Sequence, residues 1–95
     1  MKLYTRPRTL RAHQVRPGDQ LAVWTASDTP IESEARFLDA DLEEEVRWTV
    51  VHGYYDSSLK GIPLAGVPLA SMAPHRPVIV REVIELDPWS YVRTQ

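Results

Sequence analysis

The sequence predicts a small, mainly β domain, and three observations lead to this class. Residues 20–26 and 46–53 alternate their side chains between two faces and are rich in β-branched and aromatic residues, which is the pattern of a strand. Residues 77–86 form a third strand pattern that is apolar on both faces. A turn signal, residues 16–19, stands directly before the first of these strands.

The length of 95 residues predicts a single domain spanning residues 1–95. A chain of this size buries one core and leaves little room for a deep cleft inside it. Oligomerisation is therefore a natural supplement to its stability.

The first part of the chain predicts two strands and a tight turn. Residues 1–5 alternate loosely and open as a strand before Pro7, and residues 9–15 follow as a second extended segment. In the turn that comes next, Pro17 fixes φ and Gly18 tolerates a positive φ, which favours a type II turn.

Residues 28–46 allow two interpretations. In the first, Thr29, Pro30 and Glu32 form a capping box that begins a short acidic helix near residues 29–46. Its apolar stripe would consist of Ile31, Ala35, Leu38, Leu42 and Val46. In the second, residues 35–38 form a strand of a hairpin that bends at residues 39–41. With the helix, the domain is α+β in class.

The two later strands differ in the faces they offer. In residues 46–53, Val46, Trp48, Val50 and His52 point one way and the intervening residues the other. In residues 77–86 both faces are apolar, which indicates a strand covered on both sides or one central in a closed barrel.

A tandem pentapeptide lies in the long connection between these strands, residues 54–77. Residues 61–65 (GIPLA) are followed at once by residues 66–70 (GVPLA). Proline cannot donate to a sheet ladder and drives its neighbour into extended geometry. We therefore expect an ordered, extended apolar arm that packs on the domain or on another subunit.

The residues that usually carry chemistry do not form a recognisable constellation. The chain has no cysteine, and His13, His52 and His75 have no metal-ligand spacing. Residues 39–43 begin like a calcium loop, but Glu44 stands where the loop needs glycine. Ser57, Ser58 and Lys60 lack the rest of a phosphate loop. We expect neither an enzyme nor a bound metal or cofactor.

Charge is distributed unevenly along the chain. Residues 28–45 hold eight acidic side chains against Arg36 alone, and the formal net charge of the chain is −2. Residues 1–16 hold no acid. As an alternative function, we predict that this segment binds nucleic acid through four of its basic residues. These residues are Arg6, Arg8, Arg11 and Arg16.

Binding to a protein partner, or to a second copy of the chain, is the favoured function. The predicted contact surface combines the tandem repeat with the aromatic residues around it, because aromatic side chains dominate binding hot spots. It comprises Tyr54, Tyr55, Ile62, Leu64, Val67, Leu69, Trp89 and Tyr91. A further alternative is small-ligand binding or weak catalysis near His52, with Tyr54 and Ser57.

Two segments resemble a known group of folds. Residues 12–21 (AHQVRPGDQL) and 47–51 (RWTVV) resemble small SH3-like and Hint-like β-barrel proteins of actinobacteria and their phages. The resemblance covers about a quarter of the chain and implies a partly open barrel of about five strands. Self-splicing relatives need an N-terminal Cys or Ser, and Met1 stands here, so that activity is not implied.

Origin and compartment follow from composition. Arginine is frequent, lysine occurs only twice and asparagine is absent, as in a GC-rich genome, so we predict an actinobacterial or phage protein, in the latter case acting on a host protein. No apolar run follows the basic first residues, so we expect no signal peptide and a cytoplasmic location, with no membrane partner.

Overall fold

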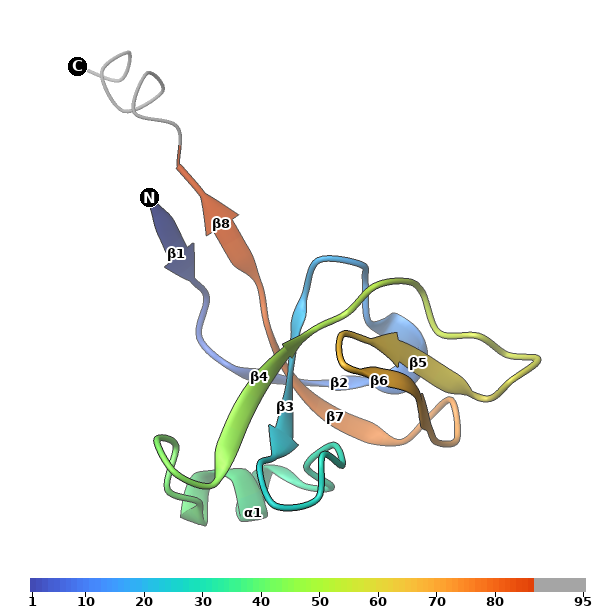
Figure 1. Cartoon of the computed structure of the whole chain (residues 1–95), viewed down its shortest axis with the longest axis horizontal. Helices are drawn as coiled ribbons and strands as arrows, with labels where there is room; N and C mark the ends of the chain where they lie inside the picture. Colours follow the sequence, from blue (N-terminus) through green and yellow to red (C-terminus); the bar gives the residue numbers. More distant parts are fainter. Residues whose placement is uncertain (87–95) are drawn as a thin grey trace.

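The computed structural model describes residues 1–86, apart from the side chains of Val67 and Pro68. The mainly β prediction with one short acidic helix is confirmed, but within residues 1–86 eight strands form three sheets and no closed barrel (Figure 1). No described helix is long and apolar enough to cross a membrane. The elements are β1 (Lys2–Tyr4), β2 (Arg8–Arg11), the 3-10 helix η1 (Ala12–Gln14), β3 (Gln20–Trp24), α1 (Glu34–Asp39), β4 (Val46–Val50), β5 (Gly61–Leu64), β6 (Val67–Ser71), β7 (Pro77–Arg81) and β8 (Val83–Glu85).

The body of the domain is a four-stranded antiparallel sheet in the order β2-β7-β3-β4. Its two inner strands are covered on both sides: Leu21, Ala22 and Val23 of β3 have no exposed surface. The middle residues of β7, Val78, Ile79 and Val80, are also buried, with at most 2% of their surface exposed. The prediction that the apolar residues from 77 onward form a doubly covered strand is confirmed for β7.

Two apolar clusters lie against this sheet, and strand alternation assigns each inner residue to one of them. Leu21 and Val23 join the larger cluster, which the β5–β6 hairpin completes with Ile62 and Leu64. Ala22 and Ile79 join the smaller cluster. There α1 contributes Phe37, whose ring meets that of Trp48 edge to face at 5.8 Å.

The turn before β3 forms as predicted. Gly18 has a φ of +92°, the left-handed backbone that glycine adopts without strain. The Asp19 N–H donates to the Arg16 carbonyl over 3.2 Å, and the Asp19 carboxylate accepts from the Arg16 N–H over 3.1 Å. The side chain of Asp19 is only 8% exposed, so this capped turn is part of the packed body.

The predicted boundaries of the helix are wrong. Helix α1 has six residues, and its N-cap is Ser33, whose hydroxyl accepts from the Arg36 N–H over 3.2 Å, rather than Thr29. The reason is upstream, because the Ile31 N–H donates to the Ala22 carbonyl and holds the chain extended beside β3.

The predicted apolar stripe of this segment also fails. Leu38 and Leu42 are 74% and 52% exposed, and Phe37 is buried in their place. A helix of fewer than two turns cannot present a stripe over five positions. The hairpin interpretation is contradicted as well, since residues 35–38 lie within α1.

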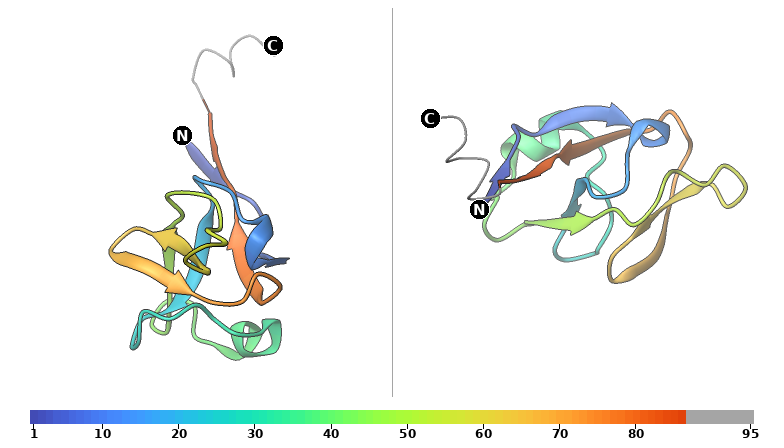
Figure 2. Two further views of the ribbon diagram at one scale, coloured as in Figure 1. Left: turned by 90° about the vertical axis from the view of Figure 1, so that its right-hand side faces the viewer. Right: turned by 90° about the horizontal axis from the view of Figure 1, so that it is seen from above.

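Residues 77–86 form two strands with different partners rather than one. Strand β7 lies between β2 and β3, whereas β8 pairs with β1 in a separate two-stranded sheet, the ribbon. The chain passes from β7 to β8 at Glu82. The Glu82 N–H donates to the Thr5 hydroxyl, and the Glu82 carbonyl accepts from the Thr5 N–H. Figures 1 and 2 show the ribbon leaving the body of the domain.

The tandem repeat is ordered and packs on the domain, as expected, but it does so as a β-hairpin rather than as a single extended arm. Strand β5 covers the first four residues of the first pentapeptide, and Gly66, with a φ of +77°, begins the second and turns the chain into β6. The pairing shifts register between Ile62 and Leu64, which accommodates the missing donor of Pro63. The hairpin is thus a separate two-stranded sheet that contributes to the core of the domain.

Candidate binding surfaces

The structure places most of the described residues of the predicted repeat surface inside the domain. Ile62 and Leu64 are 0% and 4% exposed, and Leu69 is half-buried. Tyr55 is also half-buried, and its hydroxyl donates to the Met72 carbonyl over 2.8 Å. Tyr54 alone projects, with 70% of its surface exposed.

For the other predicted contact residues, the exposure of the side chains is not described. The backbone of Val67 pairs with Leu64 at the hairpin end. Trp89 and Tyr91 lie outside the described residues. The repeat thus supplies few of the exposed side chains that we expected from it.

Two of the four predicted phosphate contacts are engaged within the chain. The Arg8 guanidinium pairs with the Glu82 carboxylate at 3.1 Å, and that of Arg11 donates to the His75 carbonyl over 2.9 Å. Arg6 and Arg16 are exposed. The four residues therefore do not form one free basic face.

The residues suggested for a small-ligand site are all on the surface. His52, Tyr54 and Ser57 are exposed, and none of the described side-chain hydrogen bonds joins them. Among residues 1–86, no group of three His, Asp or Glu side chains is arranged to hold a metal ion. The nearest approach of two histidines is the edge-to-face contact of His13 and His75, with ring centroids 5.1 Å apart.

The ribbon carries an apolar face that the sequence had not singled out. Leu3 lies directly opposite Ile84 in the ladder, and the same register puts Met1 opposite Leu86, whose N–H donates to the Met1 carbonyl. Opposite and alternate residues share a face, so Met1, Leu3, Ile84 and Leu86 lie together. We call these four residues the ribbon face. Met1, Leu3 and Ile84 are 72%, 46% and 44% exposed.

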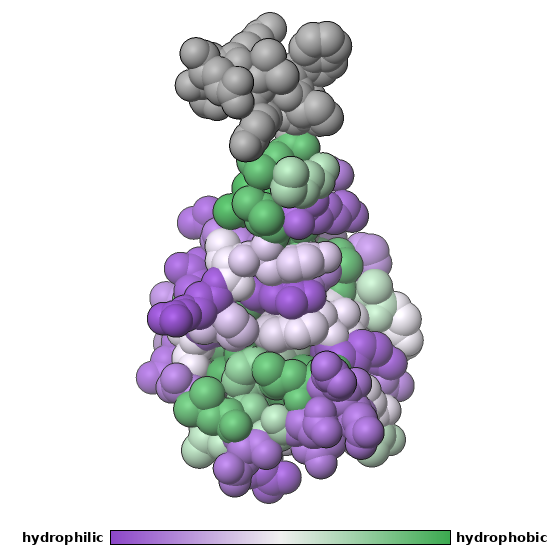
Figure 3. All heavy atoms as spheres, turned by 90° about the vertical axis from the view of Figure 1, so that its left-hand side faces the viewer, coloured by the Kyte–Doolittle hydropathy of each residue, from purple (hydrophilic) through white to green (hydrophobic). Residues whose placement is uncertain are grey.

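Figure 3 shows this end of the molecule as a space-filling view. Apolar green atoms gather at the ribbon end, and paler and purple atoms separate them from a second green area on the lower part of the same face. The ribbon face is thus apolar surface at the periphery of the domain, where no core covers it among residues 1–86.

The ribbon is attached to the body by a cation–π stack at its base. The Arg81 guanidinium carbon lies 3.9 Å from the centroid of the Tyr4 ring and 4.3 Å from that of Trp48. Its Nε donates to Gln20 Oε1 over 2.7 Å. Partial burial lowers the pKa of the Arg81 guanidinium, which nevertheless stays protonated at neutral pH. The stack joins β1, β7 and β4 through one side chain.

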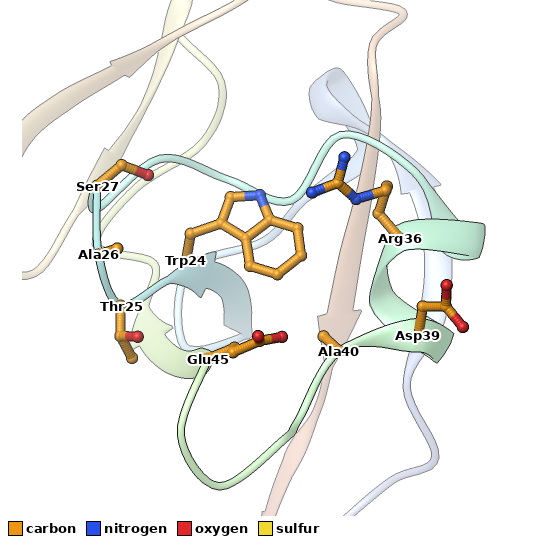
Figure 4. Close-up of a pocket in the computed structure, with 8 residues that line it drawn as sticks. All are labelled: Trp24, Thr25, Ala26, Ser27, Arg36, Asp39, Ala40 and Glu45. Carbon is orange, nitrogen blue, oxygen red and sulfur yellow. The ribbon is translucent and has the colours of Figure 1, made fainter.

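A groove of about 460 Å³ opens at the other end of the domain, around Trp24 (Figure 4). The indole lies between the turn of residues 25–27 and the side chains of Arg36 and Asp39 on α1. We call this the Trp24 groove. Its lining residues are Trp24, Thr25, Ala26, Ser27, Arg36, Asp39, Ala40 and Glu45.

One hydrogen bond and one cation–π contact hold the indole of this groove in place. The Trp24 Nε1–H donates to Glu32 Oε2 over 2.9 Å, and this bond is the main cause that lowers the pKa of the Glu32 carboxyl. The Arg36 guanidinium lies 5.4 Å from the indole centroid and 3.7 Å from Glu32 Oε1. Beneath the groove, Thr25 bonds to the backbone of Glu44 and Glu45.

Comparison with known proteins adds no assignment. A scan of protein-family models and searches of curated proteins and of solved structures find no match to this chain. The functional argument therefore rests on the surfaces described above.

Sequence reasoning missed both of these surfaces for different reasons. The ribbon face was visible as alternation, since Met1 and Leu3 are two positions apart, as are Ile84 and Leu86. Alternation within a strand does not show which other strand it pairs with, so the pattern could not place these two pairs of residues side by side. The Trp24 groove joins side chains from the end of β3, the turn after it, α1 and the turn before β4, and no local pattern brings them together.

Proposed function

We propose that this protein is a non-enzymatic protein-binding module and that the ribbon face is its contact surface. The observation that carries the proposal is the concentration of four apolar side chains on one face of a two-stranded ribbon that leaves the body. This surface replaces the tandem repeat, whose Ile62 and Leu64 are occupied in the core.

Energetics support a partner on this face. A two-stranded ribbon by itself is marginally stable in water and needs further packing on a hydrophobic face. Covering Leu3 and Ile84, which are each a little over two-fifths exposed, would remove apolar surface from water at about 25 cal/mol per Å². Both outer edges of the ribbon also lack a paired strand among the described residues, so a partner segment can add to the ladder.

The partner we propose is a protein, either a host protein bound by a phage-encoded chain or a second copy of this chain. Nucleic-acid binding through Arg6, Arg8, Arg11 and Arg16 has less support, since Arg8 and Arg11 are engaged within the chain. Ligand binding or weak catalysis near His52 has no observation in its favour.

The test compares the wild type with Leu3→Asp and Ile84→Asp, which place a charge on the ribbon face. Leu59→Asp is the matched control, because Leu59 is 65% exposed and lies in the turn before β5 rather than in the ribbon. Light scattering over a concentration series measures self-association, and affinity capture from host extract measures a foreign partner.

We expect both ribbon variants to lose the self-association or the captured partner, and Leu59→Asp to retain it. Circular dichroism and the thermal midpoint establish that each variant is folded. If folded Leu3→Asp and Ile84→Asp behave like the wild type in both measurements, the ribbon face is not the contact surface.

A further inference from the structure

We propose that the Trp24 groove is a second recognition site, which binds the cationic side chain of an arginine on a basic partner polypeptide. The proposal is independent of the ribbon face, because none of the residues that line the groove belongs to the ribbon, and α1 lies at the end of the domain away from β1 and β8 (Figure 1). It rests on an aromatic surface, on the charges around it and on a cation that the chain already places there.

The aromatic surface is the half-buried indole of Trp24. Trp24 is the last residue of β3. Its backbone N–H donates to the Thr29 carbonyl over 2.8 Å, and its backbone carbonyl accepts from the Asp28 N–H over 2.8 Å. An ion pair between Asp28 and Arg47 of β4 closes the same turn. The backbone and the Nε1–H of Trp24 are thus held in place before any ligand binds, which lowers the entropy cost of binding.

The charges around the indole favour a cation. Two carboxylates, those of Asp39 and Glu45, line the groove together with the single guanidinium of Arg36. The carboxylate of Glu32 stands next to it and accepts from the indole Nε1–H. Asp39 makes no described side-chain hydrogen bond, whereas Glu45 Oε2 accepts from the Asp41 N–H over 3.1 Å. A guanidinium that entered beside Asp39 would therefore meet a carboxylate with free acceptor positions.

Arg36 shows that this indole accepts a guanidinium. Its Cζ is 5.4 Å from the ring centroid, within the range of a cation–π interaction. The ion pair between Arg36 and Glu32 is open to solvent, since the two side chains are 66% and 47% exposed. Such an exposed pair contributes little stability, so an incoming arginine can share or displace Arg36.

The occupant is a side chain of a polypeptide rather than a metal ion or a nucleic acid. No metal-binding group of three side chains exists among residues 1–86, and carboxylates around the indole repel phosphates. An arginine fits both elements of the groove, because its planar guanidinium stacks on aromatic rings and pairs with carboxylates.

The experiment uses the full chain and a pentapeptide, Gly-Gly-Arg-Gly-Gly, with acetylated and amidated ends. Two-dimensional NMR follows the indole Nε1–H signal of Trp24, which is assigned by its loss in Trp24→Phe. The same peptide with citrulline in place of arginine is the probe control, since citrulline keeps the shape and removes the charge.

We expect a saturable shift of the Trp24 signal with the arginine peptide and none with the citrulline peptide. Asp39→Asn should weaken the affinity about three-fold, and Arg36→Gln should strengthen it by a similar factor, because it removes the competing cation. Glu43→Gln is the matched control, an exposed acid of the neighbouring turn that does not line the groove, and it should have little effect.

Several results would overturn the proposal. They are the absence of a saturable shift at millimolar arginine peptide, an equal shift with the citrulline peptide, and equal weakening by Glu43→Gln and Asp39→Asn. An equal shift with calcium chloride at matched ionic strength would make a metal ion the occupant instead. The amide spectrum of the sheet shows whether each variant is folded, and Glu45→Gln replaces Asp39→Asn if that variant is not.

Discussion

Strands β7 and β8 are consecutive and similar in composition, yet they have opposite roles. In β7, Val78, Ile79 and Val80 are all buried between two neighbouring strands and two apolar clusters. In β8, Ile84 is 44% exposed and pairs with β1 alone. The difference teaches that a run of apolar residues in a strand pattern does not by itself show whether the strand is buried, because burial depends on the neighbouring strands and layers.

The largest expected effect comes from the same substitution in the two strands. Ile79→Ala removes side-chain volume from a site that is 2% exposed and should lower the free energy of unfolding by about 3 kcal/mol. Ile84→Ala should lower it by about 0.5 kcal/mol, since much of its surface is already in water. Urea unfolding followed by tryptophan fluorescence measures both.

This matched pair can also break the comparison. Equal losses of stability for Ile79→Ala and Ile84→Ala, measured on a dilute sample, would mean that the ribbon is as much a part of the core as β7. A loss for Ile84→Ala that grows with protein concentration would instead indicate self-association through the ribbon face.

A smaller effect is expected at the junction of the two strands. Arg81→Ala removes the stack on Tyr4 and Trp48, and we expect a loss of about 1 kcal/mol together with faster amide exchange in β1 and β8. Arg8→Ala breaks only an exposed ion pair with Glu82 and should cost less than about 0.5 kcal/mol. Hydrogen exchange in the ribbon that is equal in the two variants would contradict the role of the stack.

The smallest expected effect on stability depends on pH and should be confined to the body of the domain, without reaching the ribbon. The pKa of Glu32 in the folded chain lies below its ordinary value of 4.5, chiefly because of the bond from Trp24. Its contribution to stability is therefore complete above the unfolded pKa and is lost as the pH falls through the folded value. Glu32→Gln should lower the urea midpoint slightly at pH 7, and less so at pH 3. Amide exchange in the ribbon should not respond to this substitution at either pH.

Much of the fold follows from local residue patterns. The alternation in residues 20–26 and 46–53 and the Pro17-Gly18 turn predicted β3, β4 and their entry correctly, because period and backbone freedom are local properties. Boundaries failed where a distant partner decided them. Thr29 and Pro30 have the local form of a helix start, but the Ala22 carbonyl binds the Ile31 N–H and delays the helix to Ser33.

The sequence alone determined that this is a small, mainly β domain without cysteine chemistry, and it left residues 28–46 open between a helix and a hairpin. Tertiary structure alone decided which apolar residues face water. The tandem repeat supplied Ile62 and Leu64 to the core, and Met1, Leu3, Ile84 and Leu86 were left on the ribbon face. The physical reason is that hydrophobicity is a property of a residue, whereas burial depends on what packs against it, and that is set by contacts between residues far apart in the chain.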